Sequence, residues 1–592
     1  MPFCGVVALT AATDVGNVAN AMQRWVSKHA VAQTDVPVDA GSITSFELAA
    51  NGHYRARTFA SGPTTFVGHS TTDYEPSGLV AAIVDGRPVL DHVPDAEFAV
   101  AVWDEKRRRL SLLRDTAGAR ALYFVHEPGQ WVGFASTPEP LMEIAGVRDA
   151  IDESMLPSIL VVGLSAPADA TVFARLRRVP AAHRVTFEEK TFIADRYWRL
   201  TGAPRRRGDD SVPAHLRTLL SSAVARRMHG THHNAAHLSG GLDSSSVAAL
   251  AYATRAPDDR LSLVRFEGHD ELGALYDNEE TELALALARH LPDADLHVMR
   301  LDKTEALEAA NEPAVRERPL PEMVYARGPD HRLIEAAAEL GCERVFTGWG
   351  GDEMASHRAG DSAISMLFER RWLPLAQSIR SAGLKLGLKH LLWDQWRARR
   401  SGTPFLERAD VEMVRAVFAE SPLRPAVDAL DGFLPRPEIR SRRRSLLESP
   451  RLHLGMETFD WIGQRAGVEV VHPLLDRTVL EFCDRMPIEW VASHGELRRA
   501  FRRAMVDALP EATIGRRKTQ MPPATPNLAW RRRYHAQLES GLIALIDQQS
   551  WVRRYINLSA LARQLASLDD ADDHWFLRQT AVNALVLARV EG

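Results

Sequence analysis

Hydrophobic positions in the first two hundred residues come in short runs that polar turns separate. The run at 98–103 is followed by a polar tip and by a second apolar run at 110–113, which is the pattern of a hairpin. Two further runs, at 121–125 and 131–135, flank a Pro-Gly turn at Pro128. The pattern predicts a sheet-rich region at the start of the chain.

After a polar stretch at 204–210, the pattern changes to an alternation of short apolar segments with segments of helical periodicity. The predicted strands are one that ends at Leu238 and those at 261–266, 296–301 and 344–347, and the predicted helices are 245–253, 279–290 and 331–340. This alternation predicts a doubly wound parallel sheet, in which ligands bind at the carboxyl ends of the strands. From about Ala355 onward, helical patterns predominate.

Length and composition limit the class of protein. A chain of 592 residues is too long for one hydrophobic core, so we expect two domains, 1–205 and 211–592. The net charge of -5 does not favour binding of the whole chain to nucleic acid. No apolar run is long enough to span a membrane. Three cysteines make no disulfide framework and the N-terminus has no signal-peptide pattern, so we expect a cytoplasmic protein.

A glycine- and serine-rich segment joins the first strand of the second region to its helix. It consists of Ser239, Gly240, Gly241, Leu242, Asp243, Ser244 and Ser245. The glycines let backbone approach an anion, the serine hydroxyls donate to phosphate, and the helix that follows presents free N–H groups. Asp243 would repel phosphate unless a cation lies between them, so we predict bound ATP and Mg²⁺. The alternative is an ordinary glycine turn.

A second glycine-rich loop follows another predicted strand and contains Gly348, Trp349, Gly350, Gly351, Asp352 and Glu353. The glycines, Gly348 first among them, allow the loop to pack close to a ligand. Asp352 is predicted to share the metal with Asp243, because two carboxylates with phosphate oxygens make a normal magnesium shell. The alternative is a turn with a solvated Asp-Glu pair.

Together the two loops resemble those of the asparagine synthetase family, in which the first loop reads SGGxDS. Three other segments resemble family motifs: 468–476 the E-V-R-x-P-F-L-D segment, 114–118 the R-D-x-x-G segment, and 196–198 the closing R-Y-W. The resemblance implies a glutaminase-like (Ntn-type) α+β sandwich over 1–205. It also implies an ATP-pyrophosphatase domain with helical additions over 211–592, which activates a carboxylate as an acyl-adenylate.

The N-terminal part departs from the family pattern. Glutaminase domains of this family begin Met-Cys-Gly and use the cysteine as an N-terminal nucleophile. Here Cys4 follows Met1, Pro2 and Phe3, and the Asn-Gly-Glu-Ile segment is absent, with Asp85-Gly86-Arg87 as its nearest remnant. We therefore expect an inactive glutaminase fold in which Cys4 is a core residue.

The second loop departs in another way, since asparagine synthetases usually have Gly-Glu-Gly-Ala-Asp where this chain has Trp349. Gly-Trp-Gly-Gly-Asp-Glu is typical of the lasso peptide cyclases, which join a peptide's N-terminal amine to an internal Asp or Glu side chain. The resemblance implies a ribosomal precursor peptide as partner and leaves open whether a leader peptidase is needed. The alternatives are a β-lactam synthetase or another small-molecule amide ligase, an ordinary asparagine synthetase, and an inactive scaffold.

The resemblance also implies individual roles. Lys518 stands where the family has a catalytic lysine, which would stabilise developing negative charge. Glu457 stands where β-lactam synthetases place a glutamate base, the alternative being a glutamate on a helix surface. Glu279 and Glu280 resemble an acidic pair of lasso cyclases, or are acids at a helix N-terminus. Trp349 either forms a wall of the acyl pocket or packs in the core.

Overall fold

The structure is a computed structural model of the 592-residue chain. It describes residues 2–38, 41–49, 56–61, 63–161, 167–202, 210–268, 278–301, 318–323, 328–357, 408–428, 439–493, 496–516, 528–567 and 575–590, with isolated positions between 358 and 407. The predicted linker at 204–210 lies almost wholly outside these residues.

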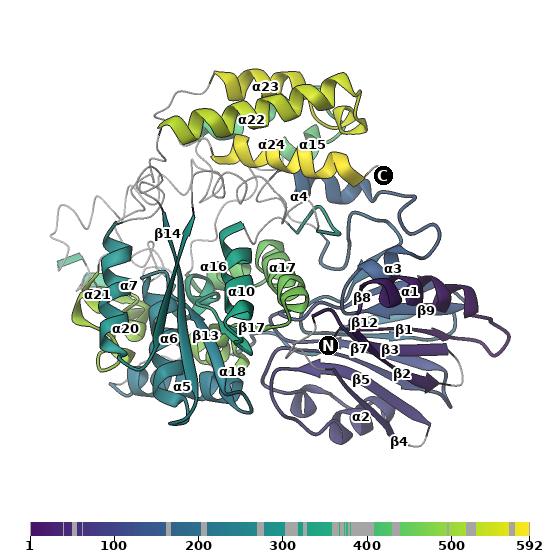
Figure 1. Cartoon of the computed structure of the whole chain (residues 1–592), viewed down its shortest axis with the longest axis horizontal. Helices are drawn as coiled ribbons and strands as arrows, with labels where there is room; N and C mark the ends of the chain where they lie inside the picture. Colours follow the sequence, from purple (N-terminus) through teal and green to yellow (C-terminus); the bar gives the residue numbers. More distant parts are fainter. Residues whose placement is uncertain are drawn as a thin grey trace.

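Two antiparallel six-stranded sheets face each other in the N-terminal region (Figure 1). The first, in the order β10-β8-β9-β1-β3-β2, consists of β10 (Arg177–Arg178), β8 (Tyr123–Glu127), β9 (Trp131–Ala135), β1 (Phe3–Ala8), β3 (Gly41–Glu47) and β2 (Ala32–Val38). The second, in the order β12-β11-β7-β6-β5-β4, consists of β12 (Phe192–Arg196), β11 (His183–Phe187), β7 (Arg109–Arg114), β6 (Phe98–Asp104), β5 (Thr64–Ser70) and β4 (Ala56–Ser61). The predicted hairpins are the pairs β6–β7 and β8–β9.

Alternation along the strands builds three apolar layers in this region. In β1, Phe3 and Val7 enter the core between the sheets, whereas Cys4 and Val6 join the cluster that contains Trp25. Trp25 belongs to α1 (Gly16–His29), which covers the first sheet, and α2 (Ser77–Val84) packs on the second. The result is the expected α+β sandwich, with helices outside two stacked sheets.

A parallel five-stranded sheet forms the centre of the second region. Its order is β15-β14-β13-β16-β17, made of β15 (Asp295–Leu301), β14 (Arg260–Gly268), β13 (His233–His237), β16 (Arg344–Phe346) and β17 (Glu469–Val471). The surrounding helices include α5 (Val212–Met228), α6 (Leu242–Thr254), α7 (Asn278–His290) and α10 (Gly328–Glu339). The predicted doubly wound sheet is confirmed, and β17 is an additional edge strand too short for a periodicity to reveal. From β13, the chain adds β14 and β15 on one side of the sheet and β16 and β17 on the other. The position between β13 and β16 is therefore the switch point at which ligands bind in such folds.

The rest of the chain is helical, as its pattern indicated. These helices are α14 (Arg408–Val417), α15 (Arg424–Asp428), α16 (Ile439–Leu447), α17 (Pro450–Ala466), α18 (Arg477–Arg485), α19 (Ile488–Val491), α20 (Arg499–Ala504), α21 (Glu511–Gly515), α22 (Leu528–Asp547), α23 (Leu558–Ala566) and α24 (Trp575–Leu587). Figure 1 shows α22, α23 and α24 as a group at the end of the molecule away from the sheets, and α17 between the two regions.

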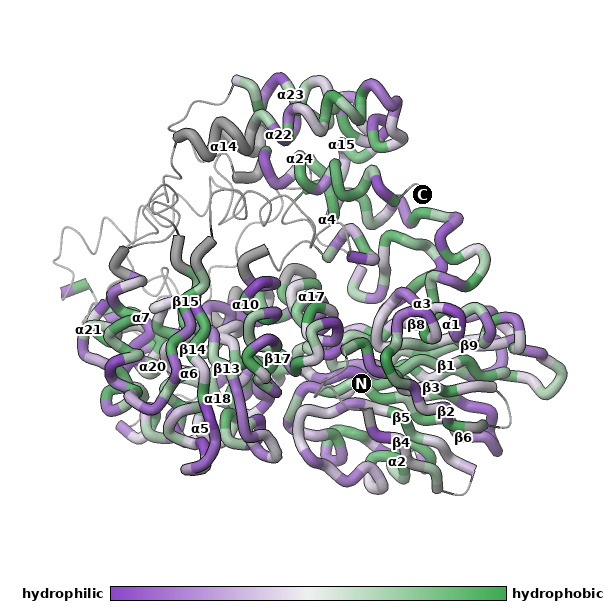
Figure 2. Tube along the Cα trace, viewed as in Figure 1, coloured by the Kyte–Doolittle hydropathy of each residue, from purple (hydrophilic) through white to green (hydrophobic). Residues whose placement is uncertain are grey.

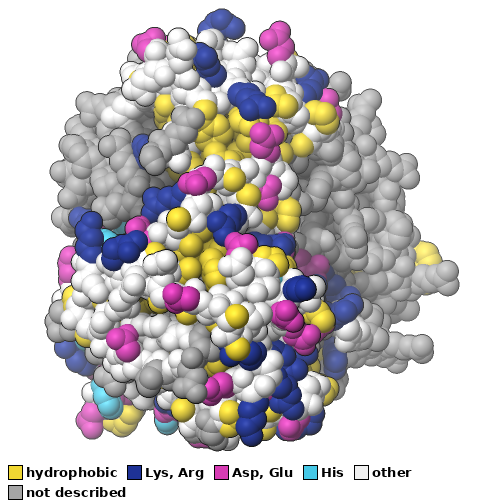
Figure 3. Space-filling view, turned by 90° about the vertical axis from the view of Figure 1, so that its right-hand side faces the viewer, with side chains coloured by type: hydrophobic (Ala, Val, Ile, Leu, Met, Phe, Trp, Pro, Cys, Tyr) yellow, Lys and Arg dark blue, Asp and Glu magenta, His cyan; other side chains and the backbone are white. Residues whose placement is uncertain are grey.

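Hydropathy follows the layers. In Figure 2 hydrophobic positions run along the strands of both regions, while the outer helices mix hydrophobic and hydrophilic residues. On the face drawn in Figure 3, hydrophobic side chains gather in the upper and central parts, and acidic and basic side chains lie near one another elsewhere. Among the residues that the structure describes, no helix combines the length and apolar character needed to cross a membrane.

Candidate active site

Both glycine-rich loops lie at the carboxyl ends of inner strands of the parallel sheet. The first follows β13 and the second follows β16, and these two strands are parallel neighbours. A Cβ on Gly348 would lie 2.6 Å from the backbone nitrogen of Ser244, and one on Gly351 would strike the Asp243 side chain. Glycine at 348 lets the two loops touch backbone to backbone, and glycine at 351 leaves room for the Asp243 side chain.

The first loop is arranged to hold an anion. The hydroxyls of Ser239 and Ser244 are 2.8 Å apart and hydrogen bonded, and the Ser239 oxygen accepts from the Gly241 N–H at 3.2 Å. Gly240 has a φ of +83°, which favours glycine. Helix α6 begins with no side-chain cap, so its first N–H groups are available to a ligand.

Ser245, which we had included among the phosphate ligands, is placed differently. Its side chain is fully buried, and its hydroxyl has no hydrogen-bond partner among the described residues. Since α6 turns this position toward the protein interior, Ser239 is the exposed hydroxyl of the loop, and the buried Ser244 is hydrogen bonded to it.

The two aspartates predicted to bind a metal do come together, and one arginine joins them. Arg498 Nη1 donates to Asp243 Oδ2 at 3.1 Å, and its Nη2 is paired with Asp352. Asp243 also accepts from the Ser356 hydroxyl. Burial raises the pKa of Asp243 and Asp352 adds to this, although Arg498 and Ser356 favour the charged form. Arg498 is the cation that balances this carboxylate pair in the structure.

These residues fit magnesium bound together with phosphate. Within the described part of the chain, no group of three or more His, Cys, Asp or Glu side chains forms a complete metal site. Mg²⁺ commonly takes one or two protein carboxylates and completes its shell with substrate phosphates and water. Asp243 and Asp352, beside a loop suited to phosphate, supply that set.

The predicted catalytic lysine, Lys518, lies outside the described residues. Arg516, the last described residue before it, pairs with Glu280 at 3.0 Å. The Glu280 carbonyl lies against Gly240, since a Cβ there would strike it. The segment that leads to Lys518 therefore starts beside the first glycine-rich loop. The side chain of Glu279 is also outside the described residues.

Trp349 packs against the protein core. Its ring meets Phe459 of α17 edge-on, with ring centroids 5.3 Å apart, and it is partly buried. The ring thus contacts the core, and its role as a wall of the acyl pocket stays a prediction.

The prediction for Glu457 needs correction. Its carboxylate is fully buried in α17 and contacts Arg114 at 2.7 Å, Arg178 at 3.2 Å and the Tyr123 hydroxyl at 3.0 Å. Burial would raise the pKa of Glu457, but Arg178 and Arg114 more than offset this and lower it. Glu457 is a counter-ion between the two regions. It is neither an accessible base nor a residue on a helix surface.

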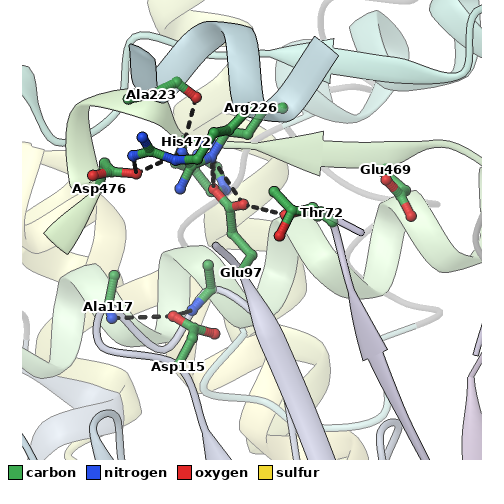
Figure 4. Close-up of polar contacts among 12 residues, drawn as sticks. Thr72, Glu97, Asp115, Ala117, Ala223, Arg226, Glu469, His472 and Asp476 are labelled. Carbon is green, nitrogen blue, oxygen red and sulfur yellow. Dashed lines mark hydrogen bonds and ion pairs between the residues drawn. The ribbon is translucent and has the colours of Figure 1, made fainter. Parts of the chain in front are cut away.

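A second buried network joins the N-terminal region to the second glycine-rich loop, and Figure 4 shows Glu97 and His472 within it. Glu97 accepts from Arg227 Nε at 2.8 Å and from the backbone N–H of His472 at 3.0 Å. The His472 ring is hydrogen bonded at 2.7 Å to the hydroxyl of Thr347, which begins the second loop. Sequence reasoning missed Glu97 and Arg227, because nothing in a single sequence pairs charges so far apart.

Cys4 lies where we expected it. It is the second residue of β1 and is buried, paired with Thr44 and Ala135 on the neighbouring strands. Burial raises the pKa of its thiol to about 12, and Asp35 adds to this effect. A thiol in this setting stays protonated and is a poor nucleophile.

Comparison with known proteins agrees with this architecture. The family model described as asparagine synthase matches residues 215–589, and the model of a glutamine amidotransferase domain matches residues 68–198. An enzyme named asparagine synthetase [glutamine-hydrolyzing] 3 from Bacillus subtilis (strain 168) is 23% identical over 525 residues, which is 85% of this chain and 78% of the relative.

More distant similarities cover less. Amidase chyE of Penicillium rubens is 27% identical over 350 residues, which is 55% of this chain and 47% of the relative. A solved allosteric regulatory enzyme of purine biosynthesis is 10% identical, covers 51% of this chain and 80% of its own, and has a TM-score of 0.22. Because the asparagine synthase model matches well over half of the 592 residues, the chain belongs to the asparagine synthase family and is an ATP-dependent, AMP-forming carbon–nitrogen ligase.

Proposed function

We propose that this enzyme is a lasso peptide macrolactam synthetase. It adenylates an internal Asp or Glu side chain of a leaderless precursor peptide and closes an isopeptide bond with the peptide's N-terminal amine, releasing AMP and pyrophosphate. The observation that carries the proposal is the Gly-Trp-Gly-Gly-Asp-Glu loop that contains Trp349, at the point where the strand order reverses. This loop is typical of lasso peptide cyclases.

The burial of Cys4 and the raised pKa of its thiol support a reaction in which the attacking amine is part of the substrate. A glutaminase of this family needs an accessible thiolate to release ammonia. Here the cysteine is a buried strand residue with a raised pKa. A ligase without its own ammonia supply needs an amine on the substrate, and the N-terminus of a peptide provides one.

In the first step, a substrate carboxylate oxygen attacks the α-phosphorus of ATP. The bond from the α-phosphorus to the β-phosphate oxygen breaks, and pyrophosphate leaves. The hydroxyls of Ser239 and Ser244 and the N–H groups at the start of α6 hold the leaving group. Magnesium, held by Asp243 and Asp352, would neutralise charge on pyrophosphate.

In the second step, the amine attacks the acyl carbon, the bond from that carbon to the AMP oxygen breaks, and the amine passes its proton to solvent. A folded peptide that places its amine near the acyl group supplies much of the rate by proximity. Glu279 and Glu280 are proposed to contact the substrate, and Glu280 is paired with Arg516.

Lys518 is proposed to stabilise negative charge in either step, and the placement of Arg516 supports this. We expect Lys518→Ala to lower product formation by about 100-fold or more while the protein stays folded. Lys190→Ala, in the N-terminal region, serves as the control. Unchanged turnover of the Lys518 variant in a mass-spectrometric assay would remove Lys518 from the site.

The function is tested with the purified chain, ATP, Mg²⁺ and a panel of peptides that carry Asp or Glu within their first residues. We expect peptide-dependent pyrophosphate release and a product lighter by one water. Aspartate with glutamine or ammonia, and β-amino acids, are run in parallel because the named relatives include asparagine synthetases. Release that depends on one of these and on no peptide would replace the proposal with the corresponding small-molecule ligase.

A further inference from the structure

Arg498 lies between the two aspartates that are proposed to bind magnesium. Its side chain is 6% exposed, and its two terminal nitrogens divide between Asp243 and Asp352. The three residues come from three separate elements: Asp243 from α6, Asp352 from the turn after β16, and Arg498 from the start of α20. The guanidinium thus neutralises the two carboxylates that are proposed to bind the metal.

The backbone of Arg498 is held in an uncommon conformation. Its φ of +59° and ψ of 32° are left-handed, and it is one of the non-glycine residues with positive φ in the described chain. This conformation costs about 1 kcal/mol for a residue with a Cβ. The ion pairs with two aspartates offset the cost, so tertiary structure holds this arginine in place.

Neighbouring arginines do not share this role. Arg499 stacks on Trp490, Arg502 donates to backbone carbonyls, and Arg503 pairs with the half-buried Glu496. Among the ion pairs that the structure describes for this helix, those of Arg498 alone join the metal-site carboxylates.

We propose that Arg498 is an internal counter-ion that occupies the metal position of the nucleotide-free enzyme and is displaced when Mg–ATP binds. The inference rests on the metal assignment within the proposed function. A guanidinium and a divalent ion compete for the same carboxylate oxygens, so the free metal binds weakly. The triphosphate changes this balance, because its oxygens complete the metal shell and offer the displaced guanidinium new acceptors.

Asp352 provides the route for this exchange. Its side chain is 51% exposed, whereas that of Asp243 is 17% exposed. The ion pair between Arg498 and Asp352 is therefore more accessible to solvent than the ion pair between Arg498 and Asp243. Arg498 is a positioning residue in this scheme: it keeps two like charges together until the substrate brings its own cation.

The test measures Mn²⁺ binding to the nucleotide-free protein by electron paramagnetic resonance. We expect Arg498→Met to bind Mn²⁺ about ten-fold or more tightly than wild type, because the competing charge is gone. Arg498→Lys, which keeps the charge, should stay close to wild type, and so should the control Arg503→Met on the same helix. If Arg498→Met does not fold, Arg498→Gln replaces it.

Equal Mn²⁺ affinity of wild type and the neutral Arg498 variants would overturn the inference. A parallel series with ATP separates this from failure of the metal site itself. If ATP does not promote Mn²⁺ binding to wild type beyond that seen with Asp243→Asn, the metal assignment fails. If ATP does promote it and the Arg498 variants still match wild type without ATP, the role of Arg498 alone is rejected.

Discussion

Asp243 is surrounded by groups with opposite effects on its charge. Burial and Asp352 favour the protonated form, whereas Arg498 and Ser356 favour the carboxylate. A divalent ion between the two aspartates would remove the unfavourable contribution of Asp352 and leave both side chains as ligands. At the scale of single residues, we therefore expect the charge of this carboxylate to affect activity.

Asp243→Asn keeps the size of the side chain and removes its charge. We expect a loss of about 100-fold or more in Mg²⁺-dependent pyrophosphate release, because the site loses one of its two anionic ligands. A coupled pyrophosphate assay measures the effect. Asp295 is an exposed residue of β15 that pairs with Arg260 of β14, and the control Asp295→Asn should keep full activity. Full activity in Asp243→Asn would reject the metal assignment.

Cys4 gives the opposite expectation at the same scale. Because its thiol is a buried core group with a raised pKa, Cys4→Ala should leave ligase turnover within about two-fold of wild type. The cost to stability should be about 1 kcal/mol from the lost sulfur packing. Turnover and thermal unfolding of the variant measure both effects. An inactive but folded variant would revive a glutaminase role for this domain.

At the scale of elements, α17 connects the two regions by buried charge. Its Glu457 meets Arg114 and Arg178, and its Asp460 accepts from Arg120 at 2.8 Å. Breaking one partner out of a buried ion pair leaves an uncompensated charge, which costs far more than the loss of a surface pair. The helix therefore makes the N-terminal sandwich part of the ligase structure.

Glu457→Gln should destabilise the protein by about 3–5 kcal/mol, because two buried arginines lose their shared counter-ion. Denaturant unfolding at neutral pH measures this. Glu448→Gln removes an exposed pair with Arg196 across the same junction and should cost under about 1 kcal/mol. The pH profile of turnover in folded Glu457→Gln should match wild type, and loss of the acidic limb would restore Glu457 as the base.

At the scale of the whole molecule, buried histidines link folding to pH. Burial lowers the pKa of His453 to about 4 and that of His472 to about 3, so both are neutral in the folded protein at pH 7. In the unfolded chain, histidine has a pKa of about 6.5. The unfolded state binds more protons between these values, so stability falls as pH falls.

We expect stability to be steady above about pH 7 and to decline from about pH 6.5 toward pH 4. Each histidine contributes up to about 3 kcal/mol of this change. Thermal unfolding across this range tests it, with His453→Asn as the comparison. The neutral amide can still donate to the Ala117 carbonyl, which His453 contacts at 3.1 Å, so the decline should be shallower in this variant. An identical pH dependence in both proteins would contradict the assignment.

The pattern of the chain by itself determined the strand–helix order, the parallel sheet and the two glycine-rich loops. These features follow from short-range causes: periodicity chooses the element, and glycine permits a tight turn. The predicted strand at 261–266 lies within β14, and the predicted helix at 279–290 lies within α7.

Tertiary structure alone decided how the charges pair. Arg114 and Glu457 are 343 residues apart in the sequence, and Arg498 and Asp243 are 255 apart. No local pattern selects one partner among the 72 basic and 77 acidic residues of this chain. Folding makes the choice, because a charge that is buried must meet whichever opposite charge is buried beside it.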